Sequence, residues 1–318
     1  MAHERIPLRL VPDPRPDEPA GRDVGVLGAV EVLPGLVRSA LLERTGVVRE
    51  RAQARFDAGS ADPRVVDEAL REAAAVFAGH APLGVGVAAA GVVDPAAGRI
   101  VEVNDAPALR GYPVAERLTE LAGAPVQVEH RARVQVLGDR WFGAGRGRRS
   151  FASVATGEVL GVGILYDGQV LAPVGGRSGA HMTVTASGDV CTCGRRGCWK
   201  TVATSRWLRD RAAALGMDPG GVSPGTLLAS ADPAARDLVV RYAENLVLGL
   251  ATVQQLFACG LFVLHGEALD GGEPFRELVE TLLRADELGG GEAPTVVLGE
   301  PADTGTLLGA AGLVLSGR

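Results

Sequence analysis

The first regular hydrophobic pattern in the chain is a series of three short apolar runs separated by turn residues. They lie at 24–32, 36–42 and 47–54, with Pro34-Gly35 and Thr45-Gly46 between them. Such runs predict three short antiparallel strands. The preceding residues are rich in Pro, Arg, Asp and Glu and lack an apolar period, so we expect a flexible tail over 1–22.

Helical periods and strand-like runs then alternate along the chain. Helices are expected from about 62 and at 114–122 and 132–142, with strands at 84–90 and 125–129 and a hairpin around 94–99. A second strand triplet at 151–155, 159–166 and 169–171 precedes helices at 205–214, 234–257, 274–284 and 303–315 and strands at 261–264 and 295–298. This repeat predicts two α/β lobes, 23–142 and 143–318, and resembles the two-lobed actin-like (ribonuclease-H-like) ATPase fold.

Charge and hydropathy exclude several classes of partner. The 318 residues are 47% hydrophobic and carry a formal net charge of −6, which is typical of a globular protein and gives no general attraction to DNA. No apolar run reaches the roughly 18 to 20 residues of a membrane span, and residues 1–21 hold no apolar signal core. We therefore expect a cytoplasmic protein with no membrane partner and no direct nucleic-acid partner.

Three cysteines crowd into one short polar segment as Cys191, Cys193 and Cys198. In a reducing compartment such a cluster favours a metal over disulfides. His181 can complete a tetrahedral site, where zinc is structural because no position stays open for water. Buried thiols or a redox pair are the alternatives, and the polar loop and the absence of a C-x-x-C spacing count against them. Cys259 lies in an apolar run and is expected to be buried.

The metal segment also carries a family resemblance. The stretch Gly179-Ala-His181-Met-Thr-Val184, followed by Cys191-Thr-Cys193-Gly-Arg-Arg-Gly-Cys198-Trp199, resembles the signature of the ROK family of repressors, open reading frames and sugar kinases. Similar segments cover most of the chain after about Asp23. The resemblance implies a sugar-related function, because ROK kinases phosphorylate sugars with ATP and Mg²⁺ and ROK repressors sense sugars with the same fold.

The residues that phosphoryl transfer needs depart from the family pattern. The general base of ROK kinases is the Asp of an Asn-Asp pair directly after the strand at 125–129, and here that pair reads His130-Arg131. An arginine stays protonated in proteins, so Arg131 cannot accept the proton of a sugar hydroxyl. The pair Asn104-Asp105 occurs earlier, within the hairpin region, and is expected to be a turn.

Both phosphate loops differ from the family pattern as well. In the family the first hairpin carries the motif Asp-x-Gly-Gly-Thr, and residues 27–31 stand at that position here. The second phosphate loop reads Ala155-Thr-Gly-Glu-Val159. Glu158 thus adds a negative charge where a phosphate would lie. The sequence therefore does not favour ATP or Mg²⁺ as cofactors and leaves structural Zn²⁺ as the expected one.

The altered positions define a predicted ligand pocket made of His130, Arg131, Ser178, His181 and Lys200. Ser178 and Lys200 stand where the family has sugar-binding glutamates, and in the family His181 couples the metal to the sugar. Because carboxylates have given way to cations, we predict a small anionic ligand or a sugar phosphate. A solvated cleft that binds nothing is the alternative.

We therefore predict a noncatalytic ROK-fold pseudokinase that acts as a regulator-like sensor without a DNA-binding domain of its own. Two alternatives remain. One is a glucokinase-like sugar kinase whose base has moved to Asp105 or Asp139, and the other is a structural partner of an active paralogue. The long helix at 234–257 is expected to support a homodimer or a pairing with a ROK paralogue.

Overall fold

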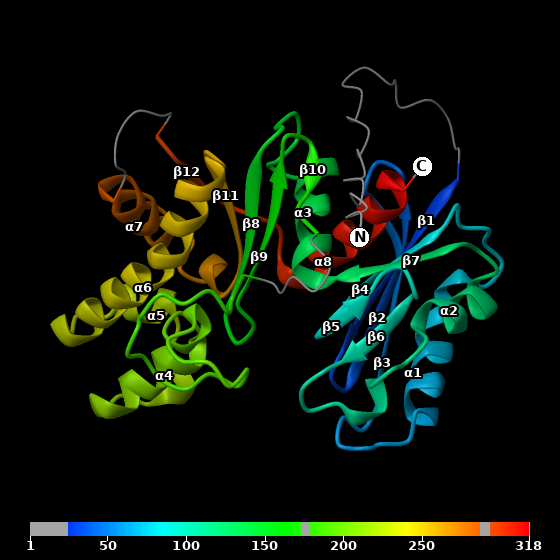
Figure 1. The fold of residues 1–318 in the computed structure, drawn as a ribbon, viewed down its shortest axis with the longest axis horizontal. Helices are drawn as coiled ribbons and strands as arrows, with labels where there is room; N and C mark the ends of the chain where they lie inside the picture. Colours follow the sequence, from blue (N-terminus) through cyan, green and yellow to red (C-terminus); the bar gives the residue numbers. More distant parts are fainter. Residues whose placement is uncertain (1–24, 173–178, 287–292, 318) are drawn as a thin grey trace, which may run out of the picture.

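Two five-stranded sheets, each with helices of its own, form two lobes that lie side by side (Figure 1). The computed structural model describes residues 25–172, 179–286 and 293–317. The two-lobed α/β architecture predicted from the repeated strand triplet is confirmed.

The first sheet has the strand order β3-β2-β1-β4-β7. Its lobe contains β1 (Val26–Leu33), β2 (Leu36–Glu43), β3 (Val48–Arg55), α1 (Arg64–Ala74), β4 (Val85–Ala89), β5 (Val92–Asp94), β6 (Arg99–Glu102), α2 (Val114–Ala122) and β7 (Val126–His130). β1 to β3 pair antiparallel as predicted, and Gly35 and Gly46 take positive φ in the two turns. The segment 27–31, assigned from the sequence to the first phosphate hairpin, lies inside β1, and the turn follows it.

The second sheet has the order β10-β9-β8-β11-β12. The rest of the chain contains α3 (Arg131–Trp141), β8 (Phe151–Thr156), β9 (Gly161–Tyr166), β10 (Gln169–Val170), α4 (Ser205–Ala214), α5 (Pro224–Ala229), α6 (Pro233–Phe257), β11 (Leu261–Gly266), α7 (Gly272–Ala285), β12 (Thr295–Leu298) and α8 (Ala302–Ser316). These elements lie close to the predicted bounds. Only α5 among the α-helices of the described residues was not predicted, because six residues are too few to establish a helical period.

Helices pack on both faces of the first sheet around β1, where buried apolar side chains alternate between the two faces. Val30 contributes to the core under α1, whereas Leu27 and Ala29 belong to a separate core with α8. The sequence grouped this closing helix with the second lobe, but α8 packs on the first sheet. A Cβ at Gly86 of β4 would overlap the carbonyl oxygen of Ala310, so the helix backbone lies directly on the strand.

Helices α3 and α8 pack against each other in the middle of the molecule (Figure 1). α3 begins where β7 ends and also packs on β8 and β9 of the second sheet. A Cβ at Gly163 of β9 would overlap the carbonyl oxygen of Ala132, so this contact is close as well. The first turn of α3 therefore stands where the two lobes meet.

The long helix α6 lies on the second lobe, where Leu238, Tyr242 and Leu246 are buried in the core. Leu248 and Leu256 of the same helix are exposed. The pairing of chains through α6 stays a prediction. Among the described residues, every helix is too short or too polar to span a lipid bilayer.

Candidate functional site

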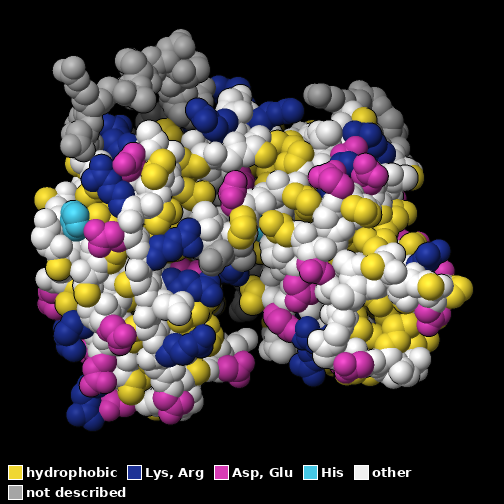
Figure 2. Space-filling model, turned by 180° about the vertical axis from the view of Figure 1, so that it is seen from behind, with side chains coloured by type: hydrophobic (Ala, Val, Ile, Leu, Met, Phe, Trp, Pro, Cys, Tyr) yellow, Lys and Arg dark blue, Asp and Glu magenta, His cyan; other side chains and the backbone are white. Residues whose placement is uncertain are grey.

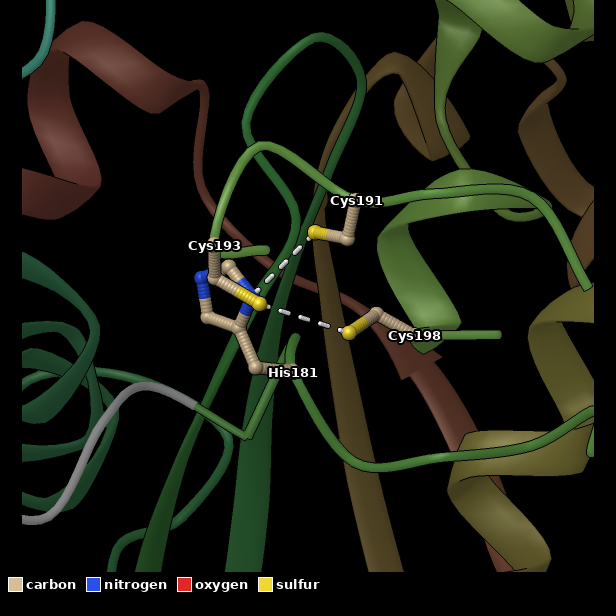
Figure 3. Close-up of side chains that lie close together, drawn as sticks. All are labelled: His181, Cys191, Cys193 and Cys198. Carbon is tan, nitrogen blue, oxygen red and sulfur yellow. Dashed lines mark hydrogen bonds between the residues drawn. The ribbon is translucent and has the colours of Figure 1, made fainter. Parts of the chain in front are cut away.

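The four predicted metal ligands come together in the segment between β10 and α4 (Figure 3). The ligand atoms of His181, Cys191, Cys193 and Cys198 all lie within 4.8 Å of one another. Cys193 Sγ is 3.7 Å from Cys198 Sγ, and His181 Nδ1 is 3.5 Å from Cys191 Sγ. Tetrahedral zinc, with bonds of about 2.3 Å to sulfur and about 2.1 Å to nitrogen, would set these separations at about 3.8 and about 3.6 Å. The four side chains thus fit a structural zinc ion.

Glycines shape the loop that carries the three thiols. Gly194 and Gly197 have φ of 83° and 66°, which favour glycine, and Gly194 N–H donates to the Cys191 carbonyl at 2.8 Å. Burial, together with hydrogen bonds to Cys193 and Cys191, raises the pKa of the Cys198 thiol to about 12. A bound cation would therefore be needed to hold Cys198 as a thiolate at neutral pH.

The metal loop is fixed to the second lobe by the residue that follows Cys198. Trp199 is fully buried, and its indole N–H donates to the Asn245 carbonyl of α6 at 2.9 Å. A Cβ at Gly249, one turn further along α6, would overlap the indole ring. The position of the loop therefore depends on close packing against α6.

A cavity of about 570 Å³ opens between the lobes. Arg131 and Gln135 of α3 line it from one side, and residues 155–159, 265–267 and 269–270 of the second lobe, with Pro301, line the rest. Seen from behind, the surface is hollowed between the two lobes (Figure 2). Of the predicted ligand-binding residues, Arg131 is the one that reaches this cavity within the described part of the chain.

Arg131 is held by a carboxylate that was not singled out as a ligand-binding residue. Its Nε lies 2.7 Å from Glu31 Oε1, and Arg38 Nη1 lies 3.1 Å from Glu31 Oε2. The Glu31 side chain is 0% exposed, whereas Arg131 and Arg38 are 16% and 29% exposed. One fully buried carboxylate thus bridges two partly exposed guanidinium groups at the edge of the cavity.

His130 serves as the N-cap of α3. Its Nδ1 accepts the Ala132 N–H at 3.2 Å, and its own N–H donates to Glu129 Oε1 at 2.6 Å. Burial, with smaller contributions from Arg133 and Arg131, lowers the pKa of His130 to about 4. His130 is therefore neutral at physiological pH and positions the start of α3 without lining the cavity.

Two acidic side chains surround the turn after β8. Glu158 forms an ion pair with Arg209 of α4, and the Glu267 side chain lies in van der Waals range of a Cβ built at Gly157. Thr156 Oγ1, at the end of β8, donates to the His265 carbonyl of β11 at 2.6 Å. Glu158 is thus present at the turn but is neutralised by Arg209, and Glu267 adds an acidic side chain beside it.

The remaining predicted ligand-binding residues lie elsewhere. Lys200 lies in the short helical segment Trp199–Thr201 beside the metal loop. Its backbone N–H donates to the Ala180 carbonyl at 3.0 Å. His181 points toward Cys191 (Figure 3). Ser178 falls outside the described residues. Arg131 thus lines the cavity, Lys200 and His181 lie at the metal loop, and a ligand pocket shared by the three stays a prediction.

Neither carboxylate considered as a displaced base lines the cavity. Asp105 is exposed in a turn with φ of 61°, as expected for this pair. Asp139 is 4% exposed, and its Oδ2 accepts from Ser153 Oγ at 2.5 Å and lies 2.8 Å from His265 Nε2. This buried cluster joins α3 to β8 and β11. No local pattern predicts it, because its members lie far apart in the chain.

Comparison with known proteins establishes the family. The sequence model of the ROK family matches residues 46–316. The chain belongs to the ROK family. The membership inferred from the histidine and cysteine motif is therefore confirmed.

ROK relatives of this chain include enzymes and repressors. A glucokinase of Thermotoga maritima is 32% identical over 130 residues, which cover 39% of this chain and 40% of that protein. A xylose repressor of Caldicellulosiruptor bescii is 24% identical over 63% of this chain and 54% of its own length. The chain thus spans about half or less of these curated relatives. The ROK hexokinase of Thermus thermophilus superposes with a TM-score of 0.76 at 25% identity, covering 90% of this chain and 96% of that one.

Proposed function

We propose that this ROK protein senses a sugar or a sugar phosphate and does not phosphorylate one. The ion pair between Arg131 and Glu31 is the observation that carries the proposal. By the family resemblance, a kinase needs a carboxylate at position 131 to accept the proton of the sugar hydroxyl. A guanidinium only donates hydrogen bonds and stays charged, and here its Nε lies 2.7 Å from a buried carboxylate.

The charges at the turn after β8 support the same proposal. Phosphoryl transfer depends on positive charge and backbone N–H groups around the phosphates. The Gly157 turn instead has Glu158 and Glu267 beside it. Arg209 neutralises the Glu158 charge, but the Glu267 carboxylate beside the turn repels a nucleoside triphosphate, so we expect Mg²⁺-ATP to bind weakly or not at all.

The metal loop supports a role in shape rather than in chemistry. His181 and the three cysteines can supply all four positions of a zinc ion, which leaves none for an activated water. The zinc would hold the loop that ends in Trp199 against α6. Such a fixed loop suits a binding protein, and the xylose repressor among the ROK relatives gives a regulatory role a precedent beside the glucokinases.

Coupled ATP turnover is the experiment that tests this function. Zinc-replete protein is assayed with a panel of hexoses and amino sugars, beside an active ROK glucokinase as a positive control, and Mg²⁺-ATP binding is measured by calorimetry on the same preparation. We expect no sugar-dependent turnover above the ATPase blank. The variant Arg131→Asp is expected to stay inactive too, because the second phosphate loop remains acidic. Sugar-dependent turnover by the wild type would refute the proposal.

A further inference from the structure

Charged side chains occupy the part of the first sheet that α8 leaves uncovered. Cross-strand partners share a face of the sheet, and Glu31 pairs with Arg38, which pairs with Gln53. The next row on this face joins Ala29, which packs under α8, to Arg51 through β2. One face of the sheet is thus apolar beneath α8 and basic beyond it.

These side chains line a second cavity of about 250 Å³. Arg38, Arg51 and Gln53 contribute to its wall, and Leu307 of α8 closes one side. Arg51 also donates to Thr304 Oγ1 in the first turn of α8 at 2.9 Å. Figure 2 shows Lys and Arg side chains gathered on this lobe beside the hollow between the lobes.

Glu31 is bonded to one lining residue of each cavity. Its Oε1 is bonded to Arg131, which lines the larger cavity, and its Oε2 to Arg38, which lines the smaller one. Two guanidinium groups share one carboxylate, so this cluster carries a net positive charge of about one, and Arg51 lies one row along the same face of the sheet. Planar guanidinium groups suit the oxygens of a phosphate, which they can bind through paired hydrogen bonds.

We propose that Arg38, Arg51 and Arg131 bind the phosphate group of a small phosphorylated sugar, and that the Glu31 carboxylate takes the place of this phosphate when no ligand is bound. The proposal rests on the sensing function above and names its ligand class and binding residues. Binding the phosphate releases Arg38 and Arg131 from Glu31, so the ligand competes with an internal carboxylate.

The charge of the opposite wall fixes the orientation of such a ligand. Glu267 and Asp270 line the larger cavity from the second lobe and repel a phosphate, whereas their oxygens accept hydrogen bonds from hydroxyl groups. Gln135 of α3 adds an amide on the other side. The sugar therefore lies in the larger cavity, with its phosphate toward the first sheet.

Calorimetric titration with glucose 6-phosphate, inorganic phosphate and glucose tests the proposal. We expect Arg38→Gln and Arg51→Gln each to weaken the binding of both phosphates about tenfold, because each removes a charged donor. Glu31→Gln is expected to strengthen it about tenfold, because the competing carboxylate is gone. Arg49→Gln is the matched control, since Arg49 lies on the same strand but pairs with Glu43 at 3.1 Å. Glucose 6-phosphate should bind more tightly than inorganic phosphate, and glucose more weakly than either.

The design separates this inference from the proposed function. Circular dichroism and zinc content identify variants that fold, and Arg51→Gln keeps both Glu31 ion pairs if Glu31→Gln does not fold. Unchanged phosphate affinity in Arg38→Gln and Arg51→Gln, or no phosphate binding by the wild type, would overturn the arginine site while leaving the noncatalytic function standing. Equal affinity for glucose 6-phosphate and inorganic phosphate would overturn the sugar's place in the larger cavity. Sugar-dependent ATP turnover would instead refute the noncatalytic function, whatever the titrations give.

Discussion

Replacing His130 with asparagine isolates the pH dependence of a single helix cap. His130 Nδ1 accepts the Ala132 N–H, which requires this nitrogen to be unprotonated. A proton there would remove the acceptor and place a positive charge at the N-terminus of α3, where the helix dipole disfavours it. These contacts agree with the lowered pKa of His130, about 4 against an ordinary 6.5, for which burial is the largest cause.

The sign and size of the effect follow from these two pKa values. The unfolded chain takes up a proton at His130 near pH 6.5, whereas the folded chain does so only near pH 4. The contribution to stability is therefore present above about pH 6.5 and is lost as the pH falls toward 4. Between pH 7 and pH 5 the free energy of unfolding should fall by about 2 kcal/mol through this group alone.

Urea unfolding at pH 7 and pH 5 measures the effect. Asparagine is also a good N-cap, so His130→Asn keeps the hydrogen bond and removes the titration. The wild type should lose about 2 kcal/mol more than this variant between the two pH values. Unfolding at pH 8 is the control, because the His130 contribution is nearly complete above pH 7 and the difference between the two proteins should stay almost constant from pH 7 to pH 8. Equal losses in the wild type and His130→Asn would refute the assignment of a depressed pKa.

Three further predictions concern the core and the metal loop. Asp139→Ala should lower the free energy of unfolding by about 2–4 kcal/mol, measured in urea, because buried Ser153 and His265 each lose a hydrogen bond. Asp139→Asn keeps an acceptor at this position and should cost less, and equal costs would contradict this role in hydrogen bonding. Cys198→Ser, or treatment with a chelator, should remove about one zinc ion per chain and lower the thermal midpoint, while Cys259→Ser should retain the zinc measured by mass spectrometry. Gly86→Ala should cost about 1–3 kcal/mol because its Cβ overlaps the α8 backbone, and wild-type stability in urea would show that the helix moves freely.

The sequence predicted those elements whose signal is local. Turn residues and apolar alternation marked the strands of both triplets, and closely spaced cysteines marked the metal loop with its histidine. The helix at Ala302–Ser316 was also predicted, but not the sheet on which it packs. Its small and apolar side chains would suit either sheet, because a periodic pattern predicts which face of a helix is buried but does not predict which sheet that face packs on.

The cavity was predicted less completely because its key pairs lie far apart in the chain. Glu31 sits between two valines of a buried strand, and its partner Arg131 is 100 positions away. The sequence identified Arg131 from the family position and placed Lys200 in the same pocket. The shared pocket stays a prediction, whereas the pairing of Arg131 with Glu31 could not be read from the family position, because a substituted side chain takes new partners in the fold.

The packing of α8 on the first sheet also constrains how the chain is made. Leu27, Ala29, Ala40 and Leu42 are covered by a helix that is synthesised more than 250 residues after the first of them. During translation this apolar face stays open until Ala302–Ser316 has left the ribosome. The first lobe to be synthesised is therefore among the last to be completed, and nascent chains that stall before α8 are candidates for chaperone capture.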